Sequence, residues 1–118
     1  MEIEVKDLSV LKSLFDKLWH PKLVMVYVWI LTRFARALIT EGYREPLHFN
    51  DLHGVDKLLR AIDLRSWIYD NPDKIAENIN KHWIYDPDRP SMKVCVYHGK
   101  GKNKHFHIQV CDRTEMRA

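Results

Sequence analysis

The end of the chain carries the residue types and the spacing that are best suited to chemistry. After Lys104, residues 105–110 alternate polar and apolar side chains, and the polar members are His105, His107 and Gln109. Because successive side chains of a strand point to opposite faces, a strand here would place these three residues on one face and the apolar residues against a core. Two imidazoles on one face suit metal binding or proton transfer.

Two further residues of metal-ligating types, His53 and Asp63, lie earlier in the chain. Residues 60–67 alternate as well, which places Asp63 on the polar face of an expected strand. A catalytic zinc site uses about three nitrogen or oxygen ligands from the protein and leaves one position open for water. His53, Asp63 and His107 would supply such a set. Zinc would then lower the pKa of its bound water and polarise a substrate carbonyl.

Each of these residues, taken alone, has an ordinary explanation as a solvated polar side chain, and their joint placement is what favours a site. His48 lies in the same expected loop as His53 and is a weaker candidate ligand. His20 precedes a proline that starts a helix, and His82 lies late in another helix, where a positive charge suits the helix dipole. We expect His20 and His82 to be structural or solvated.

The composition indicates one compact domain. The 118 residues are 46% hydrophobic and 30% charged, which is enough apolar material for a single core. The net charge of +3 is mild, and only the loop over residues 98–104 is locally basic. This loop is interpreted as a solvated hairpin connection, or as a cationic edge that attracts an anionic polymer such as nucleic acid or cell-wall glycopeptide. The chain has no nucleic-acid-binding motif, so we expect no nucleic-acid partner.

Cys95 and Cys111 form no CxxC pair, which argues against a cysteine zinc site and favours free, partly buried thiols. Residues 1–7 are acidic and lack an apolar stretch, so no secretory signal is visible. The longest apolar run, residues 23–31, is too short to cross a bilayer. We therefore expect a soluble protein without a membrane span, made in the cytoplasm.

Hydrophobic periodicity predicts three helices, which begin behind Asp7, at Pro21 and behind Asn71. Asp and Asn are good N-caps, and proline fits the first turn of a helix. The residues expected on the buried stripes are Leu8, Leu11, Phe15 and Leu18 in the first helix, Leu23, Tyr27, Ile30, Leu31, Phe34 and Leu38 in the second, and Ile75, Ile79 and Trp83 in the third.

Strand alternation predicts four strands, of which the last two form a hairpin. The predicted strands cover residues 38–44, 60–67, 92–97 and 105–111. The order of elements predicts an α+β fold, with helices packed on one face of a small, largely antiparallel sheet. The chain is expected to be one domain over residues 1–118, with a helical part over 1–36 and a part over 37–118 that carries the candidate residues.

Four segments of the chain resemble the motif series of a known family. They are Ile39-Thr40-Glu41-Gly42-Tyr43-Arg44, Leu52-His53-Gly54, Arg60-Ala61-Ile62-Asp63-Leu64-Arg65 and His105-Phe106-His107-Ile108. In order and in placement on strands they are similar to the series (I/V)TSGYR … SxHxxGRAxDi … HxH of the D-alanyl-D-alanine carboxypeptidase and hedgehog superfamily of zinc peptidases. Residues 79–90 and 105–109 also resemble small phage and prophage peptidases of this type. The resemblance covers residues 38–114 and implies a hedgehog/DD-peptidase-like fold.

The resemblance implies a role for each matching residue. His53, Asp63 and His107 would be the zinc ligands. His105 would lie beside the metal as a transition-state stabiliser or proton carrier. Arg44 would bind a carboxylate or carbonyl oxygen of the substrate, since a guanidinium donates two parallel hydrogen bonds.

The chain departs from the family pattern in two places. The family usually spaces its first His and its Asp by seven residues, whereas His53 and Asp63 are ten apart. Many members carry a carboxylate general base shortly before the last ligand, where this chain has residues 101–104, none of them acidic. The sequence does not rank the remaining candidates for the general base. They are His98, His105, Asp51 and Asp56.

Taken together, the sequence predicts a zinc-dependent peptidase that cleaves peptidoglycan stem peptides near D-alanine, of phage or prophage type, with His105, Arg44 and His98 in catalysis. The alternative is a non-catalytic protein of the same fold that keeps zinc for stability or binds the cell wall without cutting it. The lysines of residues 100–104 would border the cleft and attract the acidic glycopeptide. Without a visible export signal, such an enzyme would reach the wall after lysis or phage delivery.

Overall fold

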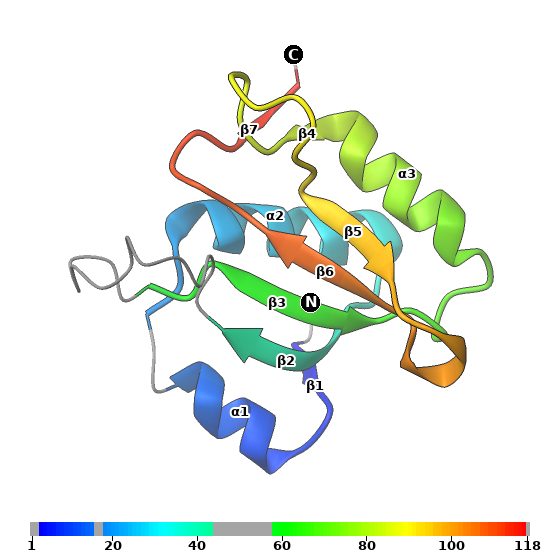
Figure 1. Cartoon of the computed structure of the whole chain (residues 1–118). Helices are drawn as coiled ribbons and strands as arrows, with labels where there is room; N and C mark the ends of the chain where they lie inside the picture. The colour runs from blue at the N-terminus through cyan, green and yellow to red at the C-terminus, as the bar shows by residue number, and fades with distance from the viewer. Residues whose placement is uncertain (1–2, 16–17, 44–57, 118) are drawn as a thin grey trace.

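A computed structural model describes residues 3–15, 18–43 and 58–117, and Figure 1 traces the chain. Within these ranges the helices and strands are, in chain order, β1 (Glu4–Val5), α1 (Leu8–Phe15), α2 (Pro21–Phe34), β2 (Leu38–Tyr43), β3 (Ala61–Arg65), α3 (Pro72–His82), β4 (Trp83–Ile84), β5 (Cys95–His98), β6 (His105–Gln109) and β7 (Glu115–Met116).

Five strands form the main sheet, in the order β1-β2-β3-β6-β5, and β4 pairs with β7 in a second, two-stranded sheet. The pairs β2–β3, β3–β6 and β6–β5 are antiparallel, whereas β1 runs parallel to β2. In Figure 1, α2 crosses behind the sheet, α1 lies beside β1 and β2, and α3 runs along β5. The α+β prediction is confirmed, but the sheet is mixed. Strands β1, β4 and β7 were not predicted, because each has two residues and is too short to show an alternating pattern.

Helix α1 begins behind Asp7, as predicted, because the Asp7 Oδ1 accepts a hydrogen bond from the backbone N–H of Val10 at 3.1 Å. The buried face differs from the predicted stripe. Val10 and Leu14, one turn apart, are buried, while Leu8 and Leu18 are each 77% exposed. The prediction for Leu8 and Leu18 is therefore wrong, since Leu8 is the first residue of the helix and Leu18 lies beyond its end.

Helix α2 starts at Pro21, as predicted, and ends at Phe34. It ends there because Ala35 adopts a left-handed conformation, with a φ of 70°. Leu38, which was expected both on the helical stripe and at the start of a strand, is the first residue of β2 and not part of the helix. Among the described residues, no helix is long and apolar enough to cross a bilayer. The buried side chains of α2 are Leu23, Val26, Tyr27, Ile30 and Leu31.

His20 holds the start of α2 in place. Its Nδ1 accepts a hydrogen bond from the backbone N–H of Lys22 at 3.0 Å, and its Nε2 donates to Asp112 Oδ1 at 2.7 Å. The side chain of Asp112 also lies 3.4 Å from the guanidinium of Arg60. His20 is only 5% exposed, so it is a structural residue, as predicted.

The register of β3 and β6 confirms the two faces predicted from alternation. Ile62 pairs with Ile108, and Leu64 pairs with Phe106. All four side chains are fully buried and belong to the same apolar core as the buried residues of α2. The polar residues of both strands therefore share the opposite face. The hairpin between β5 and β6 is also confirmed, and its turn is a short 3-10 helix over Gly101–Asn103.

Helix α3 begins at Pro72, behind Asn71, as predicted, but the side chain of Asn71 makes no capping hydrogen bond. Asn80 ties this helix to β5. Its Nδ2 donates to the carbonyl of Cys95 at 2.8 Å, and its Oδ1 accepts from the N–H of Cys95 at 2.9 Å. Cys95 and Cys111 are both free thiols and both buried. Burial raises the pKa of the Cys95 thiol to about 12, which makes it a poor nucleophile.

Gly42 marks the contact of β2 with α1. A Cβ at this position would lie 2.5 Å from Cδ2 of Leu14. We therefore expect Gly42→Val to lower the free energy of unfolding by about 1–3 kcal/mol through overpacking, as measured by urea denaturation. Leu14→Ala removes the obstructing methyl groups, so the double variant should be more stable than the sum of the two single effects predicts. Simple additivity would contradict this packing.

Asp112 should contribute stability that depends on pH. The hydrogen bond from His20 and the nearby Arg60 hold the pKa of the Asp112 carboxyl below its usual range. A lowered pKa stabilises the fold above the pKa of the unfolded state, and this stability is lost as the pH falls through the folded-state value. Asp112→Asn should therefore lower the thermal stability at pH 7 and change it little near about pH 2. The loss should not exceed about 1 kcal/mol, because the Asp112 side chain is 79% exposed. An equal loss at both pH values would show that its charge is not responsible.

Candidate functional site

Cross-strand pairing brings the candidate residues onto the polar face of the main sheet. Asp63 of β3 pairs with His107 of β6. Two residues along the strands, His105 of β6 pairs with Arg65 of β3 on one side and with His98 of β5 on the other. Residues that lie opposite one another in neighbouring strands share a face, so all five side chains project from the same side of the sheet.

The carboxylate of Asp63 lies between two imidazoles. Its Oδ1 is 2.9 Å from Nδ1 of His107, and its Oδ2 is 3.6 Å from Nε2 of His105. The side chains of Asp63 and His107 are 15% and 11% exposed, whereas that of His105 is 28% exposed. The first contact is a hydrogen bond away from most of the solvent, and the second leaves His105 open to an approaching molecule.

His105 has a defined orientation. Its Nδ1 lies 2.7 Å from the carbonyl oxygen of Asn103, and because a carbonyl only accepts, Nδ1 carries the proton. In the neutral ring, Nε2 then holds the lone pair and faces Asp63. The ring of His98 lies 4.5 Å from that of His105 and 6.1 Å from that of His107, measured between centroids. The three imidazoles and one carboxylate form a cluster of groups that can accept and donate protons.

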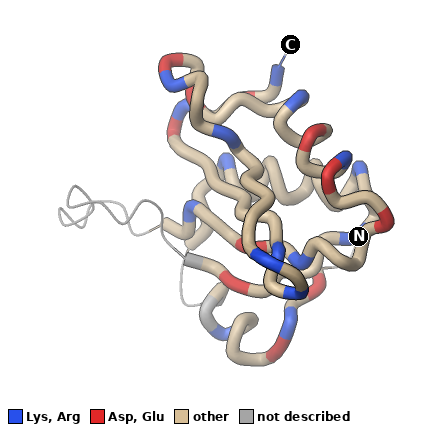
Figure 2. Tube along the Cα trace, turned by 45° about the vertical axis from the view of Figure 1, so that its right-hand side comes forward, with Lys and Arg blue, Asp and Glu red and all other residues tan. Residues whose placement is uncertain are grey.

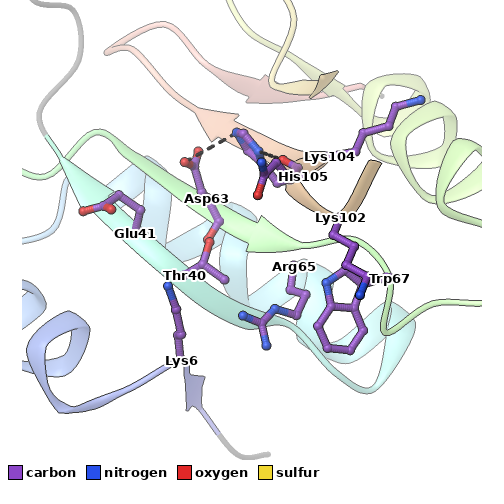
Figure 3. A pocket seen from close by; sticks show the side chains of 10 residues that line it. Lys6, Thr40, Glu41, Asp63, Arg65, Trp67, Lys102, Lys104 and His105 are labelled. Atoms are coloured by element: carbon purple, nitrogen blue, oxygen red, sulfur yellow. Dashed lines mark hydrogen bonds and ion pairs between the residues drawn. The ribbon is translucent and has the colours of Figure 1, made fainter. Parts of the chain in front are cut away.

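A cavity of about 300 Å³ opens beside this cluster (Figure 3). Asp63 and His105 line it together with Thr40 of β2. The Oγ1 of Thr40 donates a hydrogen bond to the backbone carbonyl of Asp63 at 3.3 Å. Charged side chains complete the lining. They are Lys6, Glu41, Arg65 and Lys102.

Sequence reasoning assigned no function to several residues of this cavity. Alternation did place Arg65 on the face of Asp63, which was the available indication for that residue. Trp67, at the end of the alternating residues 60–67, is in phase with Asp63 and Arg65, although β3 ends at Arg65. Lys6 gave no indication, because it reaches the cavity only through the tertiary fold. Glu41 could have been noticed as a carboxylate within the motif-bearing strand β2.

Two of the predicted site residues, Arg44 and His53, lie outside the described residues. The same holds for the weaker candidates His48, Asp51 and Asp56. Within the described ranges, no group of three or more His, Cys, Asp or Glu side chains is arranged to hold a metal ion. The described part of the expected ligand set is thus the pair Asp63 and His107, and the third predicted ligand, His53, lies outside it.

The lysines of the hairpin turn divide between two surroundings. Lys102 lines the cavity, in agreement with the expected basic border. Lys104 lines it too, but its ammonium lies 4.2 Å from the ring centroid of Tyr97 and points away from the cavity in Figure 3. Lys104 thus borders the cavity, as expected, while the aromatic face of Tyr97 attracts its cation.

His82, like His20, is a structural residue. Its Nδ1 lies 2.9 Å from the carbonyl oxygen of Asn78, and its ring packs on Trp29 at a centroid distance of 5.2 Å. These contacts are on α2 and α3, away from the polar face of the sheet. This placement agrees with the prediction for His82.

No family model matches the chain, and neither a curated protein nor a solved structure does. A function must therefore be inferred from the chain's own residues and from their geometry.

Proposed function

We propose that this protein is a zinc-dependent peptidase that cleaves peptidoglycan stem peptides, of the D-alanyl carboxypeptidase or endopeptidase type, with a hedgehog/DD-peptidase-like fold. One observation carries the proposal. Asp63, His105 and His107, which belong to two separate motifs of the resemblance, lie on neighbouring strands with the Asp63 carboxylate between the two imidazoles. Motif residues that also lie together in space are typical of a functional site, whereas unrelated polar residues are usually scattered over the surface.

Asp63 and His107 are the described residues that would hold the zinc ion. Two ligand atoms of a tetrahedral zinc lie about 3.3 Å apart, given ligand distances of about 2.0–2.1 Å. Asp63 Oδ1 and His107 Nδ1 are 2.9 Å apart in a hydrogen bond, so zinc would take the place of the proton that they share, and one side chain would shift outward. Both are acceptable zinc ligand types, and the third ligand would be His53. When bound, zinc would supply a nucleophilic water at neutral pH and polarise the substrate carbonyl.

His105 would handle the proton in this chemistry. The carbonyl of Asn103 fixes the ring so that Nε2 faces the cavity edge beside Asp63, where it can accept or return a proton. His98 packs against His105 and stabilises its orientation. Arg44 would hold a carboxylate or developing oxyanion of the substrate. An enzyme of this kind would act at the cell wall after lysis or phage delivery.

A second candidate function is a non-catalytic protein of the same fold that keeps zinc for stability or binds the cell wall. It is favoured by the residues before His107, where the family carries a carboxylate and this chain has Lys104. It is disfavoured by Glu41, a carboxylate that lines the cavity together with Asp63 and His105. Cleavage of peptidoglycan separates the two functions.

Zinc should bind at about one ion per chain. We expect elemental analysis after reconstitution and desalting to give this ratio for the unaltered protein and a large loss of zinc for His107→Ala and for Asp63→Ala. His82→Ala is the matched control, since it removes an imidazole from outside the site and should keep the metal. Full zinc content in His107→Ala would exclude the proposed centre.

His105→Ala should separate metal binding from catalysis. We expect this variant to keep its zinc and to lose peptidase activity by about two orders of magnitude or more, as expected for a lost proton carrier. The measurement is mass analysis of peptides released from purified peptidoglycan. Loss of zinc along with activity would make His105 a ligand. If the unaltered, zinc-loaded protein releases no stem peptide from several wall types, the non-catalytic function is favoured.

A further inference from the structure

We infer that the cavity beside Asp63 and His105 is a subsite that binds a carboxylate of the substrate through Lys6, Arg65 and Lys102. This inference rests on the proposed function, because it assigns a further part of the same peptide substrate. It names residues that the motif series does not include, and it predicts a preference for acidic peptides over amidated ones.

Three cations from distant segments converge on this cavity. Lys6 follows β1, Arg65 ends β3, and Lys102 lies in the turn between β5 and β6. Within the part of the chain that the structure describes, none of the three forms an ion pair with a carboxylate. Positive side chains that gather at one part of a concave site raise the local potential, which attracts and holds an anion.

Arg65 is the residue best prepared to make the contact. Its guanidinium carbon lies 4.6 Å from the ring centroid of Trp67, whose side chain is 60% exposed. Stacking on the indole limits the rotation of the guanidinium plane while leaving its N–H donors free at the edge. A planar fork of this kind fits a carboxylate through two parallel hydrogen bonds. Trp67 is thus a positioning residue for Arg65.

The cavity carries negative charge at one end and positive charge at the other, which would fix the direction of a bound peptide. Figure 3 shows Glu41 and Asp63 toward one end and Arg65, Lys102 and Trp67 toward the other. The acidic end, beside His105, is where the proposed chemistry takes place, and it would repel a substrate carboxylate toward the basic end. The separation of the two ends is therefore part of the recognition.

The spacing along β3 limits which carboxylate can bind. Asp63 and Arg65 are two residues apart on one strand face, which corresponds to about 6.6 Å between their Cα atoms. An extended peptide also advances about 3.3–3.6 Å per residue. The carboxylate held by Arg65 therefore belongs to a residue one or two positions from the bond to be cleaved.

Two synthetic stem peptides test the inference. They differ only at the two residues nearest the scissile bond on one side, which carry free carboxylates in one peptide and carboxamides in the other. We expect the unaltered protein to cleave the acid with a kcat/KM about tenfold or more above that of the amide. Arg65→Gln and Lys102→Gln should bring this ratio close to one. Because the ratio compares two substrates on one variant, a partial loss of folded protein does not affect it.

Lys104→Gln is the matched control. It removes the same charge from the same turn, but the ammonium of Lys104 lies over Tyr97 rather than in the cavity. It should keep the preference for the acid. An equal loss of preference in Lys104→Gln would overturn the subsite, because it would show a diffuse effect of net charge. A ratio near one in the unaltered protein would overturn it as well, while leaving the peptidase activity intact.

Titration calorimetry with the same two peptides tests the subsite independently of the proposed peptidase activity. Tighter binding of the acid that is lost in Arg65→Gln, without any cleavage, would support the subsite and refute the peptidase. Cleavage with equal binding of acid and amide would support the peptidase and refute the subsite. Equal binding without cleavage would refute both.

Discussion

The antiparallel pairing of β3 with β6 is the constraint on which the rest of the structure depends. In this register Asp63 lies opposite His107, and Leu64 lies opposite Phe106. Side-chain direction along a strand repeats every two residues, so a slip by one position would expose the apolar residues and separate the carboxylate from its imidazole. Burial of the apolar face therefore fixes the geometry of the polar face. The same pairing serves both the core and the candidate site.

The cavity beside this pairing depends on longer-range folding. Its walls come from the segment after β1, from β2, from the end of β3 and from the turn between β5 and β6. The Asp63–His107 contact is central and mostly buried, whereas Lys102 is exposed on a turn. Surface changes in the turn can alter the charge of the cavity without disturbing the central pair. The charge of the cavity and the geometry of the central pair therefore depend on different parts of the fold.

The sequence was sufficient to predict side-chain direction in segments that follow a single periodicity. Alternation placed Asp63, His105 and His107 on one face, because a strand allows only two directions for a side chain. It was insufficient where tertiary packing decides. The first helix turned Val10 rather than Leu8 to the core, and Lys104 turned to the ring of Tyr97. The contribution of Lys6 to the cavity depends on contacts between distant segments, which no local pattern encodes.

The two hydrogen bonds between the side chain of Asn80 and the backbone of Cys95 affect the edge of the main sheet. Strand β5 is the outer strand of the main sheet on that side, and an outer strand offers unpaired backbone groups to any other chain. The amide of Asn80 donates to the carbonyl of Cys95 and accepts from its N–H, as a neighbouring strand would. One side chain of α3 thereby occupies the position where a sixth strand would begin to pair, and it protects this edge against intermolecular strand addition and aggregation.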